Sequence, residues 1–335
     1  MEKVYSLDPM IAKGKKLEDA LVSLKISSTF IDATESLYSN VYYFKLLDPL
    51  AIMRIEKVIP ALEVLFSTQS GEISFAHTPH HPIAHFSLII ENEERTIAHL
   101  SNYKHHLSKK ENTVLYGIDI ATGELVYSNL IDTPHLLIAG ASGSGKSVLL
   151  HNIIASLCKY NKQNDTSLVL IDTKQVEFAQ YGIEEFDEYL AAPICYDAKT
   201  ALYTLKAISK KMDERFAKMK EKGLKIYDGT KWVVIIDEFA DLMLANKHSI
   251  EPLIVRIAQM GRACGVHLVI ATQRPSVDVC TGLIKANIPD RIALRCASIK
   301  DSMVILDKKG AETLKGKGEA LVRIGNTFKK VQCFN

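Results

Sequence analysis

The sequence predicts an α/β fold with a mostly parallel sheet, preceded by a smaller α+β domain. After Leu115, short apolar runs alternate with helical segments, whereas the residues before it mix helices with short alternating strands. Strands that alternate with helices form βαβ units, and such units build parallel sheets. We therefore expect an N-terminal α+β domain over residues 1–110 and a larger α/β domain over residues 111–335.

The N-terminal domain has helical stretches at residues 15–25 and 52–66. Apolar and polar residues alternate over residues 83–90 and 95–100, which predicts strands with one buried face. A polar run over residues 108–112 interrupts these patterns and marks the end of the domain.

In the second domain the apolar runs are nearly continuous, which is typical of strands buried on both faces of a parallel sheet. They predict strands at residues 135–139, 168–171, 233–236, 268–271 and 292–296. Helical patterns at residues 148–160 and 200–222 lie between them. The second of these helices has apolar residues at spacings of three and four, which predicts a face packed on the sheet.

The composition is that of an ordinary globular protein, with 47% hydrophobic and 24% charged residues. No apolar run is long enough to span a bilayer, and the first residues lack the apolar core of a secretory signal. The six cysteines form no Cys-x-x-Cys pair, which favours free thiols in a reducing cytosol over disulfides or a zinc site. These features predict a cytoplasmic location and no integral membrane segment in this chain.

A glycine-rich loop follows the apolar run at residues 135–139. It matches the pattern G-x-x-x-x-G-K-[ST] at every position, with Gly140, Ala141, Ser142, Gly143, Ser144, Gly145, Lys146 and Ser147. Glycines let such a loop bend around phosphate groups, and the helix that follows adds the positive end of its dipole. We expect Lys146 to reach the β- and γ-phosphates and the Ser147 hydroxyl to bind Mg²⁺. The motif therefore predicts ATP and Mg²⁺ as ligands.

Acidic residues follow two of the predicted strands. Asp237 and Glu238 come directly after residues 233–236, at the edge where ligands bind in open α/β sheets. We expect Asp237 to hold Mg²⁺, directly or through water, and Glu238 to be the general base toward the attacking water. Asp172 ends another strand, and with Lys174 it either lines the same site or makes a local cap or ion pair.

Two further residues are candidates for the catalytic set that includes Lys146. Gln273 follows the strand at residues 268–271, where an amide can sense the γ-phosphate and align water. Arg262 lies near the end of the helix before that strand. It is either an arginine supplied to the ATP of a neighbouring subunit, which raises turnover by roughly 10³ to 10⁵, or a cation favoured by the helix dipole.

Taken together, these segments resemble the FtsK/SpoIIIE family of DNA translocases, from about residue 117 to residue 320. The stretches that carry the resemblance are PHLLIAGASGSGKS (134–147), IDTKQVEF (171–178), MDERFAKMKEKG (212–223), VVIIDEFADLM (233–243), GRACGVHLVIATQRPSVDVCTGLIKANIPDRIAL (261–294) and ILDKKGAETLKGKGEAL (305–321). The residues before Tyr116 are only loosely similar to the smaller α domain that precedes the family's ATPase β domain.

The resemblance implies a RecA-like P-loop NTPase core in a homohexameric ring around double-stranded DNA, with ATP hydrolysed between subunits. In that setting Arg262 matches the family's arginine finger, Arg274 falls in the first pore loop, and Lys300 lies in the second DNA-contacting segment. Met303 stands where the family usually has arginine, which weakens the contacts expected there. The formal net charge of +2 does not decide for or against DNA, because a ring can hold its positive charge inside its pore.

We therefore predict an ATP-driven double-stranded DNA translocase in chromosome segregation or DNA transfer. The family's winged-helix module and membrane helices are absent from these residues, which predicts an excised or compact motor, with a membrane-bound protein as a candidate partner. A protein-secretion ATPase is an alternative with a similar core, although such proteins usually link several ATPase modules and this sequence has one P-loop. A nucleotide-switched binding module is a third alternative, but it has no need of Glu238 or Arg262.

Overall fold

The computed structural model describes residues 8–69, 72–78, 81, 83–92, 96–109, 113–130, 132–158, 166–325 and 327–335. These residues form two compact units. The smaller unit comprises the chain up to Thr96 together with Asp119–Glu124. The larger unit comprises Ile97–Ile118 and Leu125–Asn335.

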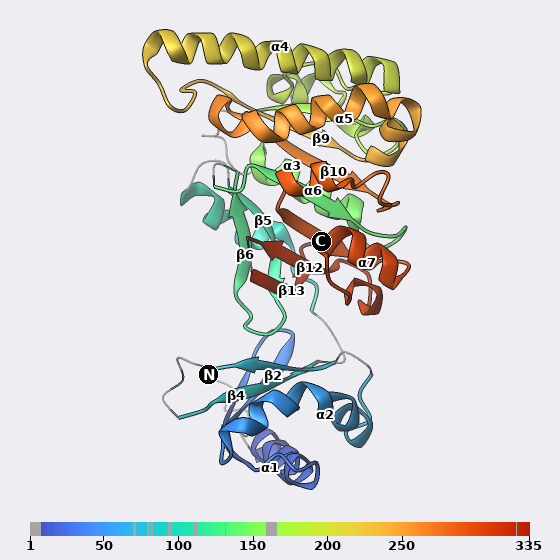
Figure 1. Ribbon diagram of the computed structural model, residues 1–335. Coiled ribbons are helices and arrows are strands. Elements are labelled where there is room, and N and C mark those ends of the chain that lie inside the picture. Colours follow the sequence, from blue (N-terminus) through green and yellow to red (C-terminus); the bar gives the residue numbers. More distant parts are fainter. Residues whose placement is uncertain are drawn as a thin grey trace. The chain divides into compact units, whose positions relative to one another are not determined.

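The smaller unit is an antiparallel sheet with two helices, as predicted for an α+β domain. Its strands pair in the order β1-β2-β4-β3. The elements are α1 (Asp8–Ser23), β1 (Ser28–Glu35), β2 (Ser39–Leu46), η1 (Pro49–Ala51), α2 (Ile52–Leu65), β3 (Ile73–His77) and β4 (Phe86–Glu91). Figure 1 shows α1 and α2 on one face of this sheet, where Leu17 and Ile55 share a core with Phe44 and Phe86.

The predicted strand at residues 95–100 is wrong over its described part. Thr96 to His99 have no regular structure, and Leu100 begins a 3-10 segment, η2 (Leu100–Lys109); Arg95 lies outside the described residues. This stretch packs on the C-terminal residues of the larger unit. The Asn335 backbone N–H donates to the Ala98 carbonyl at 2.9 Å, and the Tyr103 ring lies 4.9 Å from the Phe334 ring. Contacts divide the chain after Thr96 and also assign Asp119–Glu124 to the smaller unit, whereas the boundary predicted from the sequence lies after residue 110.

The larger unit is built on a nine-stranded sheet with the order β6-β5-β13-β12-β11-β7-β10-β9-β8. Its strands are β5 (Thr113–Asp119), β6 (Leu125–Asn129), β7 (His135–Ala139), β8 (Thr166–Ile171), β9 (Lys231–Ile236), β10 (Val266–Thr272), β11 (Asp290–Leu294), β12 (Glu319–Ile324) and β13 (Thr327–Cys333). The strands β8, β9, β10, β7 and β11 are parallel and correspond to the predicted apolar runs. At the other end, β11–β12, β12–β13 and β5–β6 pair antiparallel.

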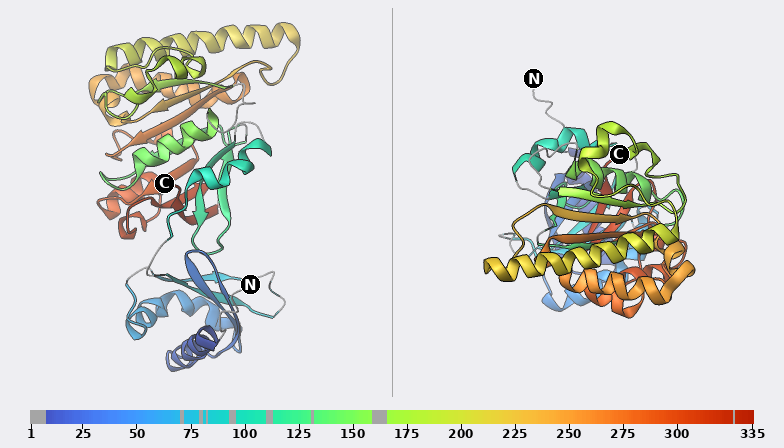
Figure 2. Two further views of the ribbon diagram at one scale, coloured as in Figure 1. Left: turned by 180° about the vertical axis from the view of Figure 1, so that it is seen from behind. Right: turned by 90° about the horizontal axis from the view of Figure 1, so that it is seen from above.

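Helices cover both faces of the parallel strands. They are α3 (Lys146–Leu157), α4 (Ala198–Lys222), α5 (Phe239–Cys264), α6 (Gly282–Asn287) and α7 (Ile299–Leu306), with short 3-10 segments η3 (Ala179–Tyr181), η4 (Glu184–Tyr189) and η5 (Ala311–Thr313). The helices α4 and α5 pack on one face and α3 on the other (Figure 2). Alternate residues of each strand enter the two cores: Leu137 and Leu268 face α4 and α5, whereas Leu136 and Val269 face α3. This double burial explains the nearly continuous apolar runs.

The six cysteines are all free and buried, as expected from their scattered positions. Burial raises the pKa of the Cys264 thiol to about 11, so this residue beside Arg262 stays protonated at neutral pH. No helix among the described residues combines the length and apolarity that crossing a membrane requires.

The C-terminal end of α5 is held tightly against the sheet. A Cβ added at Gly261 would lie 2.2 Å from the Val266 carbonyl oxygen, at the amino end of β10. The Arg215 guanidinium of α4 donates to the carbonyl oxygens of Cys264 and Gly265 at 2.8 and 3.0 Å. This close backbone approach fixes where the neighbouring Arg262 leaves the helix.

We expect Gly261→Ala to destabilise the larger unit, because the methyl group forces α5 away from β10. Overpacking of this kind lowers the free energy of unfolding by about 1–3 kcal/mol. This loss exceeds the stability that replacing glycine by alanine adds through the higher helix propensity of alanine. Urea unfolding followed by circular dichroism measures the effect. Gly282→Ala is the matched control, since nothing lies within 4 Å of its Cβ position. Equal midpoints for the two variants would contradict the close packing described above.

Candidate nucleotide site

The glycine-rich loop connects the carboxyl end of β7 to the amino end of α3. Gly143 and Gly145 have φ angles of +73° and +103°, in the left-handed region that favours glycine. A Cβ at Gly145 would lie 2.7 Å from the Gly318 backbone nitrogen, so a larger residue does not fit there. A Cβ at Gly143 would meet nothing within 4 Å, which leaves the backbone of the loop accessible to a ligand.

Backbone hydrogen bonds fix the loop to three other segments. Gly140 N–H donates to the carbonyl of Thr272 at 3.3 Å, and Ala141 N–H donates to the carbonyl of Arg295 at 2.8 Å. Gly318 N–H donates to the carbonyl of Ser144 at 2.8 Å. The loop is therefore preorganised by the last residue of β10, by the residue that follows β11 and by the glycine-rich turn at residues 316–318. The loop fits the triphosphate of a nucleotide, because phosphate groups bind backbone N–H groups at the amino end of a helix.

Lys146 and Asp237 form a buried ion pair. Their side chains are 3% and 2% exposed. The Lys146 ammonium contacts a carboxylate oxygen of Asp237 and also donates to its backbone carbonyl at 2.9 Å. Burial raises the pKa of the Asp237 carboxyl, and the positive charge of Lys146 opposes that shift. The pair places the predicted phosphate-binding cation directly beside the predicted metal ligand.

Ser147 contacts a residue that the sequence analysis did not identify. Its hydroxyl donates to the Glu177 carboxylate at 2.6 Å, and the other oxygen of Glu177 lies 3.7 Å from His151 Nε2. Glu177 is the second acidic residue, after Asp172, within the family-like stretch at 171–178, and that stretch was the available signal. Among the described residues, no group of three or more His, Cys, Asp or Glu side chains could hold a metal. A Mg²⁺ ion at Ser147 and Asp237 would thus take further ligands from phosphate and water.

The carboxylate of Glu238 lies at the end of β9 and is 2% exposed. It accepts hydrogen bonds from the Thr272 hydroxyl at 2.7 Å and from the Gln273 backbone N–H at 3.1 and 3.2 Å. The Lys174 ammonium lies 3.2 Å away. Lys174 therefore belongs to the site. Asp172 instead accepts from two backbone N–H groups of its own loop, those of Lys174 and Phe178, and supports that loop.

Strand register brings most of the predicted residues to one edge of the sheet. Thr272 of β10 pairs with Ala139 of β7, so Gln273 and the glycine-rich loop leave the sheet side by side. Arg274 is exposed and directly follows Gln273, whose side chain is half-buried. Lys300 is also exposed and lies in the first turn of α7, beyond the carboxyl end of β11. Both predicted DNA-contacting residues are thus on the edge that holds the nucleotide loop.

Arg262 is separated from this edge. It is exposed in the last turn of α5, next to the amino end of β10. Gln273 follows the carboxyl end of the same strand, which has seven residues. At about 3.3 Å per residue, these two ends lie roughly 20 Å apart. Arg262 therefore lies far from the nucleotide loop of its own chain.

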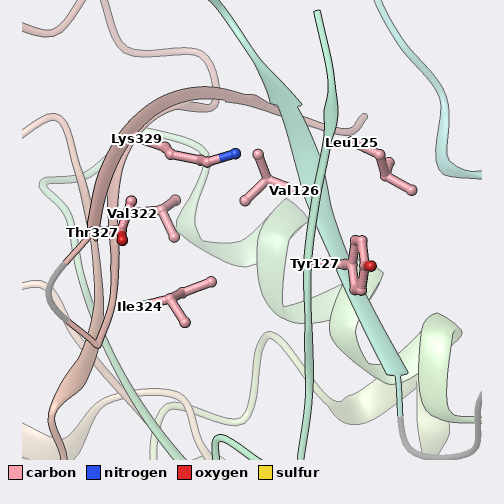
Figure 3. Close-up of a pocket in the computed structure, with 7 residues that line it drawn as sticks. All are labelled: Leu125, Val126, Tyr127, Val322, Ile324, Thr327 and Lys329. Atoms are coloured by element: carbon pink, nitrogen blue, oxygen red, sulfur yellow. The ribbon is translucent and has the colours of Figure 1, made fainter. Parts of the chain in front are cut away.

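A pocket lies at the antiparallel end of the larger sheet and shares no residue with the nucleotide loop. Figure 3 shows its mostly apolar lining, which consists of Leu125, Val126, Tyr127, Val322, Ile324, Thr327 and Lys329. Its lining contains neither a carboxylate nor a thiol, so it offers no chemistry that matches the sequence motifs.

Comparisons with known proteins agree with this geometry. The model of the FtsK/SpoIIIE family matches residues 97–231 and 228–277, more than half of the chain. The DNA translocase FtsK of Caldanaerobacter subterraneus subsp. tengcongensis is 36% identical over 327 residues, which cover 93% of this chain and 45% of that protein. The chain thus spans less than half the length of this curated relative.

Two solved structures share the fold. The pCW3 conjugation coupling protein TcpA, in a monomer form with ATPγS, has a TM-score of 0.65 and 23% identity, covering 96% of this chain and 95% of that one. The cytoplasmic domain of the type VII secretion ATPase EccC of Thermomonospora curvata has a TM-score of 0.58 and 23% identity, covering 68% and 29%. The larger unit therefore has the fold of a P-loop ATPase motor, and the chain belongs to the FtsK/SpoIIIE family.

Proposed function

We propose that this chain is an ATP-driven double-stranded DNA translocase that works as a homohexameric ring in chromosome segregation or DNA transfer. The observation that carries the ATPase part is the convergence of Lys146, Asp237 and Glu238 at one edge of the sheet. The DNA part rests on the 36% identity to a DNA translocase over nearly the whole chain. Because the substrate is chromosomal or transferred DNA, the proposed location is the cytoplasm, and a membrane-bound protein is a proposed further partner.

The geometry supports hydrolysis by direct attack of water. The water oxygen bonds to the γ-phosphorus, the bond to the β-phosphate oxygen breaks, and the Glu238 carboxylate takes the water proton as ADP leaves. Lys146 and the backbone of the glycine-rich loop hold the phosphates, and Gln273 aligns the water. When bound, Mg²⁺ neutralises charge on the β- and γ-oxygens, with Ser147 and Asp237 as the proposed protein ligands.

The position of Arg262 supports assembly into a ring. About 20 Å of β10 separates it from the nucleotide loop of its own chain, so we propose that it acts on the ATP of a neighbouring subunit. Arg274 and Lys300 are the proposed contacts to the DNA backbone. Contacts of this kind go mainly to phosphates and are sensitive to salt, which suits a motor that moves over any sequence.

Two other functions are alternatives to this proposal. A protein-secretion ATPase is supported by the shared fold with EccC, but at 23% identity that similarity concerns the fold alone. A nucleotide-switched binding module is disfavoured because such a module has no need of the proposed base Glu238 or of the proposed arginine finger Arg262. The response of the ATPase to duplex DNA separates the DNA translocase from both.

We expect linear duplex DNA to stimulate ATP hydrolysis strongly, and the stimulation to fall as salt rises, because phosphate contacts release counterions. Steady-state ATPase assays at two salt concentrations, with and without DNA, measure this. Lys146→Ala is the inactive control, since it removes the cation that binds phosphate. Hydrolysis that ignores DNA at both salt concentrations would favour the secretion ATPase.

We expect Glu238→Gln to bind ATP and to hydrolyse it about 10²- to 10⁴-fold more slowly, because the amide cannot take the water proton. Binding of a fluorescent ATP analogue and single-turnover hydrolysis measure the two effects separately. Glu221→Gln makes the same chemical change at an exposed position of α4 and serves as the control. Parental hydrolysis by Glu238→Gln would show that another group is the base.

We expect Arg262→Ala to retain ATP binding and to lose turnover by roughly 10³-fold or more. Mixing it with Lys146→Ala should restore part of the activity, because an Arg262 from one subunit then faces an intact nucleotide loop on the next. A mixture of Lys146→Ala with the double variant, which carries both changes, should stay inactive. If the first mixture assembles but gains no activity, Arg262 does not act between subunits.

A further inference from the structure

The carboxylate of Glu238 is expected to activate water, yet it already accepts several hydrogen bonds from the protein. One oxygen accepts from the Thr272 hydroxyl at 2.7 Å, the Gln273 N–H reaches both oxygens, and the Lys174 ammonium contacts the other oxygen. A carboxylate has about four lone-pair positions for hydrogen bonds. In this arrangement protein donors take up most of the lone-pair positions of the Glu238 carboxylate. Few of these positions remain to accept a hydrogen bond from an attacking water.

Thr272 links this carboxylate to an exposed residue. Its side chain is fully buried, and its hydroxyl donates to Glu238 while its oxygen accepts from the Arg274 N–H at 3.0 Å. The parallel pairing of Ile270 with Ile236 places β9 and β10 in the register that makes this contact possible. A continuous chain of hydrogen bonds therefore runs from the backbone of Arg274 to the carboxylate of Glu238.

The segment after Thr272 is a compact turn with its own backbone hydrogen bonds. The Ser276 N–H donates to the Arg274 carbonyl at 2.8 Å, and the N–H groups of Val279 and Cys280 donate to the Ser276 carbonyl. Arg274 itself is exposed. Arg274 therefore belongs to a compact turn whose first hydrogen bonds are those to Thr272 and Glu238.

We propose that Thr272 is a positioning residue that holds Glu238 in a resting orientation, and that duplex DNA at Arg274 withdraws the Thr272 hydroxyl and frees the carboxylate for water. The second half of this inference rests on the proposed DNA contact at Arg274. The general base needs a lone pair aimed at the water proton in the reacting geometry. DNA stimulation of the ATPase would then come from releasing one hydrogen bond at the end of β10.

The test uses Thr272→Val, which keeps the shape and removes the hydroxyl, and Thr272→Ser, which keeps the hydroxyl. ATP hydrolysis is measured with and without saturating duplex, and DNA binding is measured by fluorescence anisotropy. We expect Thr272→Val to raise the DNA-free kcat on the order of tenfold, as the loss of a hydrogen bond to a charged group allows. KM for ATP and the affinity for DNA should stay near parental values, and Thr272→Ser should behave like the parent.

A fall of the DNA-free kcat in Thr272→Val would overturn the proposal, because Thr272 would then support the active orientation. An unchanged DNA-free kcat with full DNA stimulation would overturn it as well. If Thr272→Val does not fold, Thr272→Ala carries the same expectation. If DNA fails to stimulate even the parent, the proposed translocase function fails, whereas the DNA-free rate of Thr272→Val still decides whether the hydroxyl restrains Glu238.

Discussion

The parallel pairing of β7 with β10 and of β10 with β9 is the constraint on which the rest of the site depends. Parallel strands end at the same edge, so this pairing gathers residues that are far apart in the chain. Ala139, Ile236 and Thr272 are the last residues of the three strands, and each is followed directly by site residues. A shift of one residue in β10 would turn Thr272 away from Glu238 and disrupt the support of the glycine-rich loop.

Buried charge is the second feature that organises this edge. Lys146, Asp237 and Glu238 are nearly inaccessible, and charges in such places need partners because leaving water is costly. In this structure the partners come from the protein: Lys146 for Asp237, and Thr272, Gln273 and Lys174 for Glu238.

The two ends of β10 contact different parts of the larger unit. Its carboxyl end contacts the predicted base, whereas its amino end receives α5 and Arg262, which Gly261 and Arg215 hold close to the sheet. One strand therefore separates the nucleotide loop from Arg262, the arginine that we propose acts on a neighbouring subunit. This arrangement gives a physical reason why the proposed function calls for more than one copy of the chain.

Much of the larger unit could be predicted from the sequence. The parallel strands, the glycine-rich loop and the acids after β9 all depend on local patterns of apolar, glycine and acidic residues, and each was found where the pattern placed it. No bounds were predicted for the antiparallel strands β5, β6, β12 and β13, and the predicted strand at residues 95–100 was wrong. That stretch pairs with the last residues of the chain, a contact that no local pattern encodes.

By itself, then, the sequence determined which residue types are available for phosphate, metal and water, because those chemistries need fixed spacings along a loop or after a strand. The tertiary structure decided which of them meet. Glu177 reaches Ser147, Thr272 reaches Glu238, and Arg262 is carried away from its own nucleotide loop. These outcomes follow from strand order and register, which join residues distant in the chain and leave no signature in any one segment.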